Sequence, residues 1–129
     1  MDHLSLANKF NTFAFEIKDK CTSIDSEITS LQDNEFFRRI IFSRYYYALY
    51  HKFLAHNDEL ASKTGPGLHE VLLNKVQAYS DPKLYQTFIK LRNLRIWADY
   101  KDNDHTALKV NLNTINKDVY SIIKRTTIN

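Results

Sequence analysis

Apolar residues recur in alternating steps of three and four along most of this chain, and this spacing constrains the fold more than any other feature. One such series is Phe10, Phe13, Ala14, Ile17, Cys21, Ile24, Ile28 and Leu31; another is Leu108, Leu112, Ile115, Val119 and Ile122. A period near 3.6 residues is that of an amphipathic α-helix. The 129 residues include only two glycines and two prolines, so the chain can build few tight turns. The sequence therefore predicts an all-α fold.

Five helices follow from the same pattern. The first ends where the polar residues 32–34 interrupt the spacing, the second runs from about Glu35 to about His56, and a short third one contains Leu68 and Val76. Ser80 or Asp81 can cap a fourth helix that starts at Pro82, since proline is favoured at the first helical position. The segment 57–70, "NDELASKTGPGLHE", contains both glycines and is predicted to be a loop. We expect a single domain over residues 1–129, an up-and-down bundle of five helices.

The composition limits the possible environments of the chain. The net charge is +3, from 18 Lys and Arg against 15 Asp and Glu, which is too small to establish nucleic-acid binding by itself. No apolar run is long enough to cross a bilayer, and the N-terminus lacks the basic start and apolar block of a secretory signal. A single cysteine excludes an intrachain disulfide and fits a reducing compartment. We therefore expect a cytoplasmic protein without membrane contact.

The stretch "FSRYYYALYH" places Arg44 and His51 two helical turns apart with Tyr47 between them. In one interpretation these are structural residues, with Arg44 in an ion pair and His51 hydrogen-bonded in the core. In the other, Arg44 neutralises a phosphate while His51 moves a proton. The spacing favours the structural interpretation. We expect Tyr46 and Tyr47 to face inward and Tyr45 to lie at the flank of the helix or at a dimer contact.

A second polar series lies in "LRNLRIWADY", where Arg92, Arg95 and Asp99 share one helix face. Aromatic bulk around Asp99 suggests that the face is covered, and a buried carboxylate requires a cation. Arg95 can supply it from the same helix and Arg44 from the facing one. We predict an Arg44–Asp99 charge pair that joins the two helices.

The sequence contains no pattern for a metal or a cofactor. It lacks a glycine-rich phosphate loop and a cysteine pair, and the histidines at positions 3, 51, 56, 69 and 105 are scattered. We expect neither a metal site nor a cofactor.

Two motifs together resemble the HEPN superfamily, in particular its small stand-alone prokaryotic members. The first pattern is matched by Ser43, Arg44, Tyr46, Tyr47, Ala48 and His51, and the second by Arg95, Ala98, Asp99 and Tyr100. The resemblance covers about residues 35–125. It implies a helical bundle, usually dimeric, in a superfamily associated with RNA and nucleotides. Many of its members are metal-independent endoribonucleases that act as toxins or in phage defence.

The resemblance leaves two functions open. Asp99 stands where catalytic members carry a histidine, although Arg92 is followed by Asn93 as in many of them. We therefore predict a non-catalytic module that binds RNA, a nucleotide or a partner protein through Arg92, Asn93 and Arg95. The partner implied is a nucleotidyltransferase or an antitoxin. The alternative is a ribonuclease toxin with Arg44, Tyr47 and His51 as its catalytic residues. In both cases we expect a two-fold homodimer.

Overall fold

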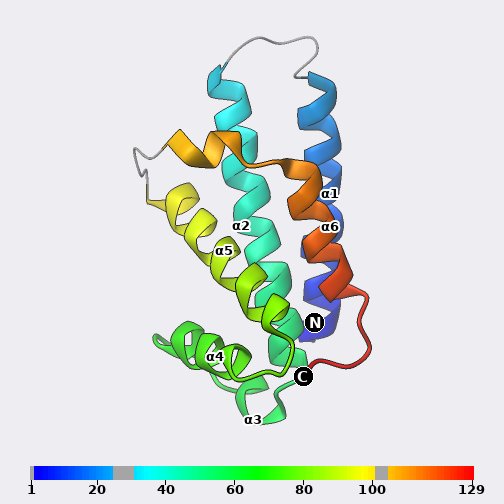
Figure 1. Cartoon of the computed structure of the whole chain (residues 1–129), viewed down its shortest axis with the longest axis vertical. Coiled ribbons are helices and arrows are strands. Elements are labelled where there is room, and N and C mark those ends of the chain that lie inside the picture. The colour runs from blue at the N-terminus through cyan, green and yellow to red at the C-terminus, as the bar shows by residue number, and fades with distance from the viewer. Residues whose placement is uncertain (1, 25–30, 101–104) are drawn as a thin grey trace.

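The computed structural model describes residues 2–24, 31–100 and 105–129, and all regular secondary structure in them is helical (Figure 1). The elements in chain order are α1 (His3–Ile24), α2 (Leu31–Ala55), α3 (Asp58–Ala61), α4 (Leu68–Gln77), α5 (Pro82–Asp99), the 3-10 helix η1 (His105–Lys109) and α6 (Leu112–Ile123). The all-α prediction is confirmed. No helix in the described part of the chain has both the length and the hydropathy needed to cross a membrane.

Two details of the predicted bundle are wrong. The described residues form six α-helices rather than five, because Asp58–Ala61 make one helical turn within the expected loop. Leu60 drives this turn, since its side chain is buried in the core and its amide bonds back to the carbonyl of Asn57. The polar residues 32–34 begin α2 instead of separating two helices.

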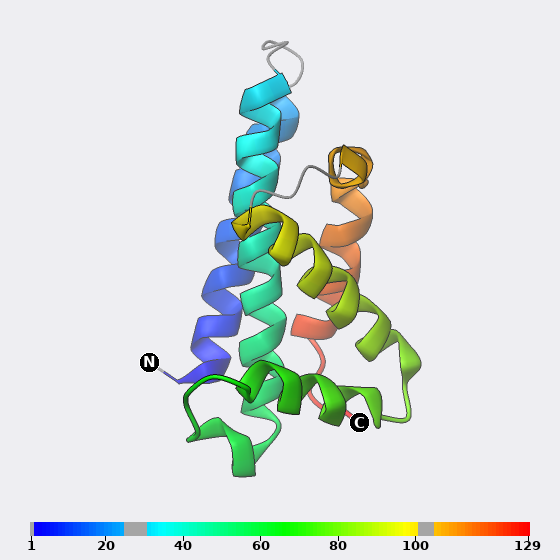
Figure 2. The ribbon, with the colours of Figure 1, turned by 90° about the vertical axis from the view of Figure 1, so that its left-hand side faces the viewer.

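The central element of the bundle is α2. Helix α1 runs antiparallel along it, α5 crosses it on another side, and α4 and α6 also pack against it (Figures 1 and 2). Its buried side chains point in several directions and include Ile41, Phe42, Tyr45, Tyr46, Leu49 and Phe53. A helix with apolar side chains on more than one face needs neighbours on more than one side to bury them. The other helices are arranged accordingly around α2.

The three consecutive tyrosines contact different neighbours. Tyr45 and Tyr46 are both fully buried: the Tyr45 hydroxyl donates to Asn116 of α6 at 2.8 Å, and the Tyr46 hydroxyl lies 2.6 Å from His69 Nδ1 of α4. Tyr47 is only partly buried. The prediction for Tyr46 is confirmed, whereas Tyr45 at the helix flank is wrong. The 100° step between residues turns Tyr45 towards α6, which covers that side of α2.

The predicted start of α5 is confirmed. Pro82 occupies the first turn, and the Asp81 carboxylate accepts a hydrogen bond from the Lys83 amide at 3.0 Å. Asp81 also accepts from the Arg125 guanidinium at 2.8 Å, and this bond lowers the pKa of the Asp81 carboxyl. The N-terminus of α5 is thereby attached to the C-terminal segment.

The core around Phe88 gives the first prediction. Phe88 is fully buried and its ring stacks on Tyr46 at 5.5 Å between centroids, whereas Phe36 on α2 is 61% exposed. Phe88→Ala should lower the free energy of unfolding by about 3–5 kcal/mol, because it removes a buried ring and leaves a cavity. The matched Phe36→Ala should change it by no more than about 0.5 kcal/mol. Urea titrations of both variants measure the difference, and equal losses would contradict this description of the core.

Candidate functional site

Helices α4 and α5 form a helix-turn-helix. Residues 78–81 join them in a four-residue turn, closed by bonds from the amides of Ala78 and Tyr79 to carbonyls of the last turn of α4. The Tyr79 hydroxyl accepts a hydrogen bond from Asn57 at 2.7 Å, which attaches the turn to the end of α2. In Figure 2, α4 lies across the lower end of the bundle and α5 rises from it in a different direction. Two helices joined by so short a turn have the form of the helix-turn-helix motif.

The outward face of α5 is polar and basic. Lys83, Gln86, Lys90 and Asn93 follow one another at steps of three, four and three, and all four are exposed. We call these residues the α5 stripe. The opposite face of the helix is buried through Leu84, Phe88 and Leu91. The stripe therefore presents two ammonium groups and two amides to solvent from a helix that is fixed by its apolar side.

Three described carboxylates beside α5 are each paired with an arginine. Asp81 pairs with Arg125 and Glu70 with Arg92, while Asp99 lies 3.1 Å from Arg95 Nε. The α5 stripe itself contains no acidic residue, and neither of its lysines forms an ion pair with a described residue. Pairing of the surrounding acids leaves the positive charge of the stripe available to an anionic partner.

The structure separates the three residues predicted to bind. Arg92 is held by Glu70, and Arg95 lies against the rings of Tyr46 and Tyr47, 5.3 and 5.5 Å from their centroids. Only Asn93 faces solvent, as a member of the α5 stripe. Sequence analysis missed Lys83, Gln86 and Lys90. Their helical spacing after the Asp81–Pro82 start was the signal that could have identified them.

Arg44, Tyr47 and His51 converge on one residue of α1. The Arg44 guanidinium lies 5.6 Å from the centroid of the Phe10 ring, and the rings of Tyr47 and His51 lie 6.0 and 5.7 Å from it. His51 Nδ1 is 2.7 Å from Nδ1 of His3, whose Nε2 lies 2.7 Å from the Ala61 carbonyl. These contacts attach the start of α1 to α2 and α3.

The predicted Arg44–Asp99 pair is not among the ion pairs of the described residues. Both residues line a cavity of about 310 Å³ between α2 and the end of α5, but the carboxylate of Asp99 pairs with Arg95. Arg95 is four residues before Asp99 on the same helix, where the two side chains meet without any movement of the backbone. The described residues also contain no group of three or more side chains arranged to hold a metal ion.

The helix-turn-helix lies within a segment that matches a known family. The family model described as "Mor transcription activator family" matches residues 52–129, from the last turn of α2 to the end of the sequence. The chain belongs to the Mor transcription activator family. No curated protein and no solved structure shows significant similarity to it.

This assignment overturns the HEPN resemblance. It also removes the predicted role as an RNA-binding, nucleotide-binding or partner-binding module in toxin–antitoxin or defence systems, and the ribonuclease alternative. In this Mor family member, Arg95 lies against Tyr46 and Tyr47 in the contact between α2 and α5. Arg44 and His51 instead contact α1. The motifs therefore reflect packing.

The His51 contacts predict a pH dependence of stability. Burial, and then the nearby His3 and His69, lower the pKa of His51 from 6.5 to about 4. Between these values the unfolded chain binds a proton that the folded chain does not, so this stabilisation is complete above pH 6.5 and is lost as the pH falls through 4. Stability should therefore decrease from pH 7 to pH 5, and less steeply in His51→Gln. Urea titrations at the two pH values measure both slopes, and parallel slopes would exclude His51 as a cause.

Proposed function

We propose that this protein is a DNA-binding transcription activator that inserts α5 into the major groove. The observation that carries the proposal is the α5 stripe: a solvent-facing basic and amide-bearing surface on the second helix of a helix-turn-helix. Helix-turn-helix proteins place this second helix in the groove, with its N-terminal residues at the base edges. The Mor family match supports the same function and includes both helices.

The residue types of the stripe suit the two kinds of DNA contact. Lysine ammonium groups neutralise backbone phosphates and supply affinity that depends on salt. The amides of Gln86 and Asn93 can each donate and accept at once, which matches the N6 and N7 edge of adenine. Gln86 lies in the first turns of α5, the part of a recognition helix with which helix-turn-helix proteins contact base edges. We assign phosphate contacts to the lysines and base contacts to the amides.

Local charge, rather than the net charge of the protein, is what would draw α5 to DNA. The formal net charge of +3 is small. Three ion pairs neutralise the carboxylates beside α5. Arg125 pairs with Asp81, Arg92 with Glu70, and Arg95 with Asp99. Lys83 and Lys90 therefore have no carboxylate partner among the described residues, and their charge is open to a polyanion.

The lysines can be tested against a matched pair on another helix. Lys83→Ala/Lys90→Ala should weaken binding to duplex DNA selected from a random library, and should reduce the slope of log affinity against log salt by about 2. Lys117→Ala/Lys124→Ala removes the same charge from exposed positions near the C-terminus and should leave both quantities almost unchanged. Fluorescence anisotropy at several salt concentrations measures them. Equal effects of the two variants, or a larger effect of the second, would rule out α5 as the DNA-contacting helix.

Gln86 tests base recognition separately from affinity for the backbone. Gln86→Ala should cost about 1–3 kcal/mol of binding to the selected sequence, because its amide no longer reads a base. Binding of Gln86→Ala to unrelated duplex should not change. The control is Gln77→Ala, at an exposed glutamine at the end of α4, which should change binding to neither DNA. Competition with selected and unrelated DNA gives both numbers. A uniform loss on both DNAs would assign Gln86 to backbone contact.

A further inference from the structure

Residues 125–129 lie against the turn of the helix-turn-helix and give the start of α5 a contact outside α4. The Asn129 carbonyl accepts hydrogen bonds from Ser80 Oγ and from the Asp81 amide, both at 3.3 Å. Ile128 packs in the core and is 6% exposed. Figures 1 and 2 show the C-terminal end of the chain beside α4. This segment therefore contacts the two residues that lead into α5.

Arg125 connects this segment to two other helices. Its Nη1 donates to Oδ2 of Asp81, the N-cap of α5, at 2.8 Å. Its carbonyl accepts from the ammonium group of Lys52 on α2 at 2.7 Å, and Lys52 is only 4% exposed. The Arg125 amide continues the last turn of α6 by bonding to the carbonyl of Ile122 at 3.1 Å. The first turn of α5 is thus linked through one residue to the central helix and to α6.

The Asp81 carboxylate divides its two oxygens between α5 and Arg125. Oδ1 accepts from the Lys83 amide at 3.0 Å, and Oδ2 accepts from Arg125. The first turn of a helix contains amides without intrahelical partners, and helix ends fray. A carboxylate that is bonded through both oxygens has little rotational freedom, and its bond to a guanidinium is a strong one. The pair therefore limits the movement of the turn that carries Lys83 and leads to Gln86 of the α5 stripe.

We propose that Arg125 is a positioning residue for DNA recognition, which acts through Asp81 to hold the first turns of α5 in the orientation that base contact by Gln86 requires. This inference rests on the proposed function of α5. The Arg125 guanidinium is paired with a carboxylate, which distinguishes it from the lysines of the stripe. Base recognition requires side chains to be placed within about 0.5 Å, whereas phosphate contacts carry no sequence information. Loss of the Arg125 contact should therefore reduce discrimination between sequences more than affinity for the backbone.

Arg125→Gln tests the proposal, because it removes the guanidinium and leaves the backbone carbonyl that binds Lys52. It should raise the dissociation constant for the selected duplex about tenfold, the loss expected for one charge-assisted hydrogen bond. Affinity for unrelated duplex and the slope of log affinity against log salt should be almost unchanged, because no phosphate contact is lost. Arg125→Lys can still pair with Asp81 and should recover most of the affinity. Fluorescence anisotropy with both DNAs measures these quantities.

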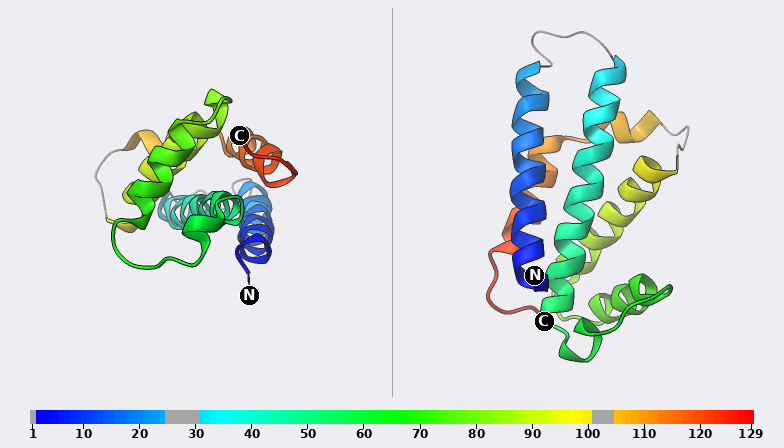
Figure 3. Two further views of the ribbon diagram at one scale, coloured as in Figure 1. Left: turned by 90° about the horizontal axis from the view of Figure 1, so that it is seen from below. Right: turned by 180° about the vertical axis from the view of Figure 1, so that it is seen from behind.

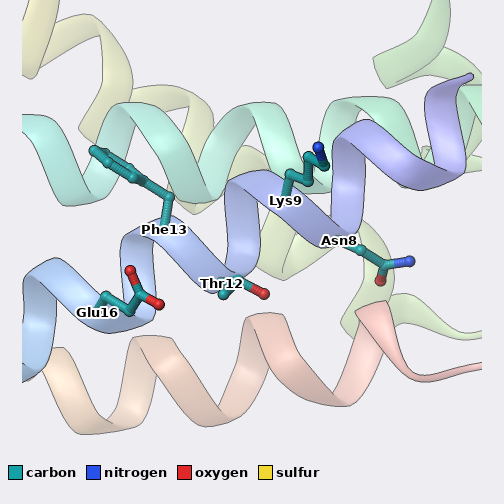
Figure 4. Close-up of a pocket in the computed structure, with 5 residues that line it drawn as sticks. All are labelled: Asn8, Lys9, Thr12, Phe13 and Glu16. Atoms are coloured by element: carbon teal, nitrogen blue, oxygen red, sulfur yellow. The ribbon is translucent and has the colours of Figure 1, made fainter. Parts of the chain in front are cut away.

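Lys9→Gln is the control for the loss of one positive charge. Lys9 is exposed on α1, where it lines a surface cavity (Figure 4). Helices α1 and α5 lie on opposite sides of α2, as the view from below in Figure 3 shows. The variant should therefore leave the affinity for both DNAs unchanged. An equal effect of Lys9→Gln and Arg125→Gln would mean that Arg125 contributes net charge rather than position, and would overturn the proposal.

Asp81→Asn separates positioning from direct contact of Arg125 with DNA. Asparagine can still cap α5, but the ion pair is lost and the surface becomes more positive. Positioning predicts weaker binding to the selected duplex, whereas an Arg125 that contacted phosphate would bind more tightly once it is released. Hydrogen exchange gives a readout without DNA, because the Lys83 and Leu84 amides both bond to Asp81. These amides should exchange faster in both variants, while circular dichroism shows unchanged helix content.

Three results would each overturn the proposal: equal losses of Arg125→Gln on selected and unrelated DNA, tighter binding by Asp81→Asn, or no effect of Arg125→Gln. Lys83→Ala/Lys90→Ala, measured in parallel, reports on the proposed function itself. If those lysines affect binding and Arg125 does not, only the positioning role is wrong. If neither affects binding, α5 is not the DNA-contacting helix and both proposals are wrong.

Discussion

The burial of side chains on several faces of α2 organises the rest of the bundle. Its aromatic and aliphatic side chains point in several directions, so α1, α4, α5 and α6 all have to pack against this one helix. An ordinary amphipathic helix needs a partner on one face only. The bundle is therefore organised around a single central helix, and the outer faces of α1 and α5 remain available for contacts with other molecules.

The polar ends of the buried α2 side chains can be buried because each forms a hydrogen bond with another part of the chain. Tyr45 bonds to Asn116 and Tyr46 to His69, and the buried ammonium of Lys52 donates to the Arg125 carbonyl at 2.7 Å. Removing such a partner would strand a buried polar group, which costs more than the bond itself contributes. Burial also lowers the pKa of Lys52. These bonds determine which neighbour lies against each side of α2.

Two arginines make contacts between α2 and α5, so polar motifs in the sequence did not identify the family. Arg39 of α2 lies 4.0 Å from the ring of Trp97 and donates to the carbonyls of Trp97 and Ala98, so it satisfies the last turn of the helix. Arg95 similarly lies on the tyrosines of α2. Arginines that look like phosphate ligands in the sequence serve here to join two helices. The candidate DNA-binding residues are lysines and amides on the other side of α5.

The helical class follows from local sequence, because the three-four spacing of apolar residues is that of an amphipathic helix. The start of α5 does so too, because Asp81 and Pro82 act locally. Local sequence also brings Arg44, Tyr47 and His51 to one side of α2, since helical periodicity fixes that relation. The packing of distant helices decides that Tyr45 is buried, and that Asn93 is exposed while Arg92 is half-buried beside Glu70. Each of these depends on which helix covers which side of its neighbour. That arrangement follows from packing between distant segments, which local spacing does not encode.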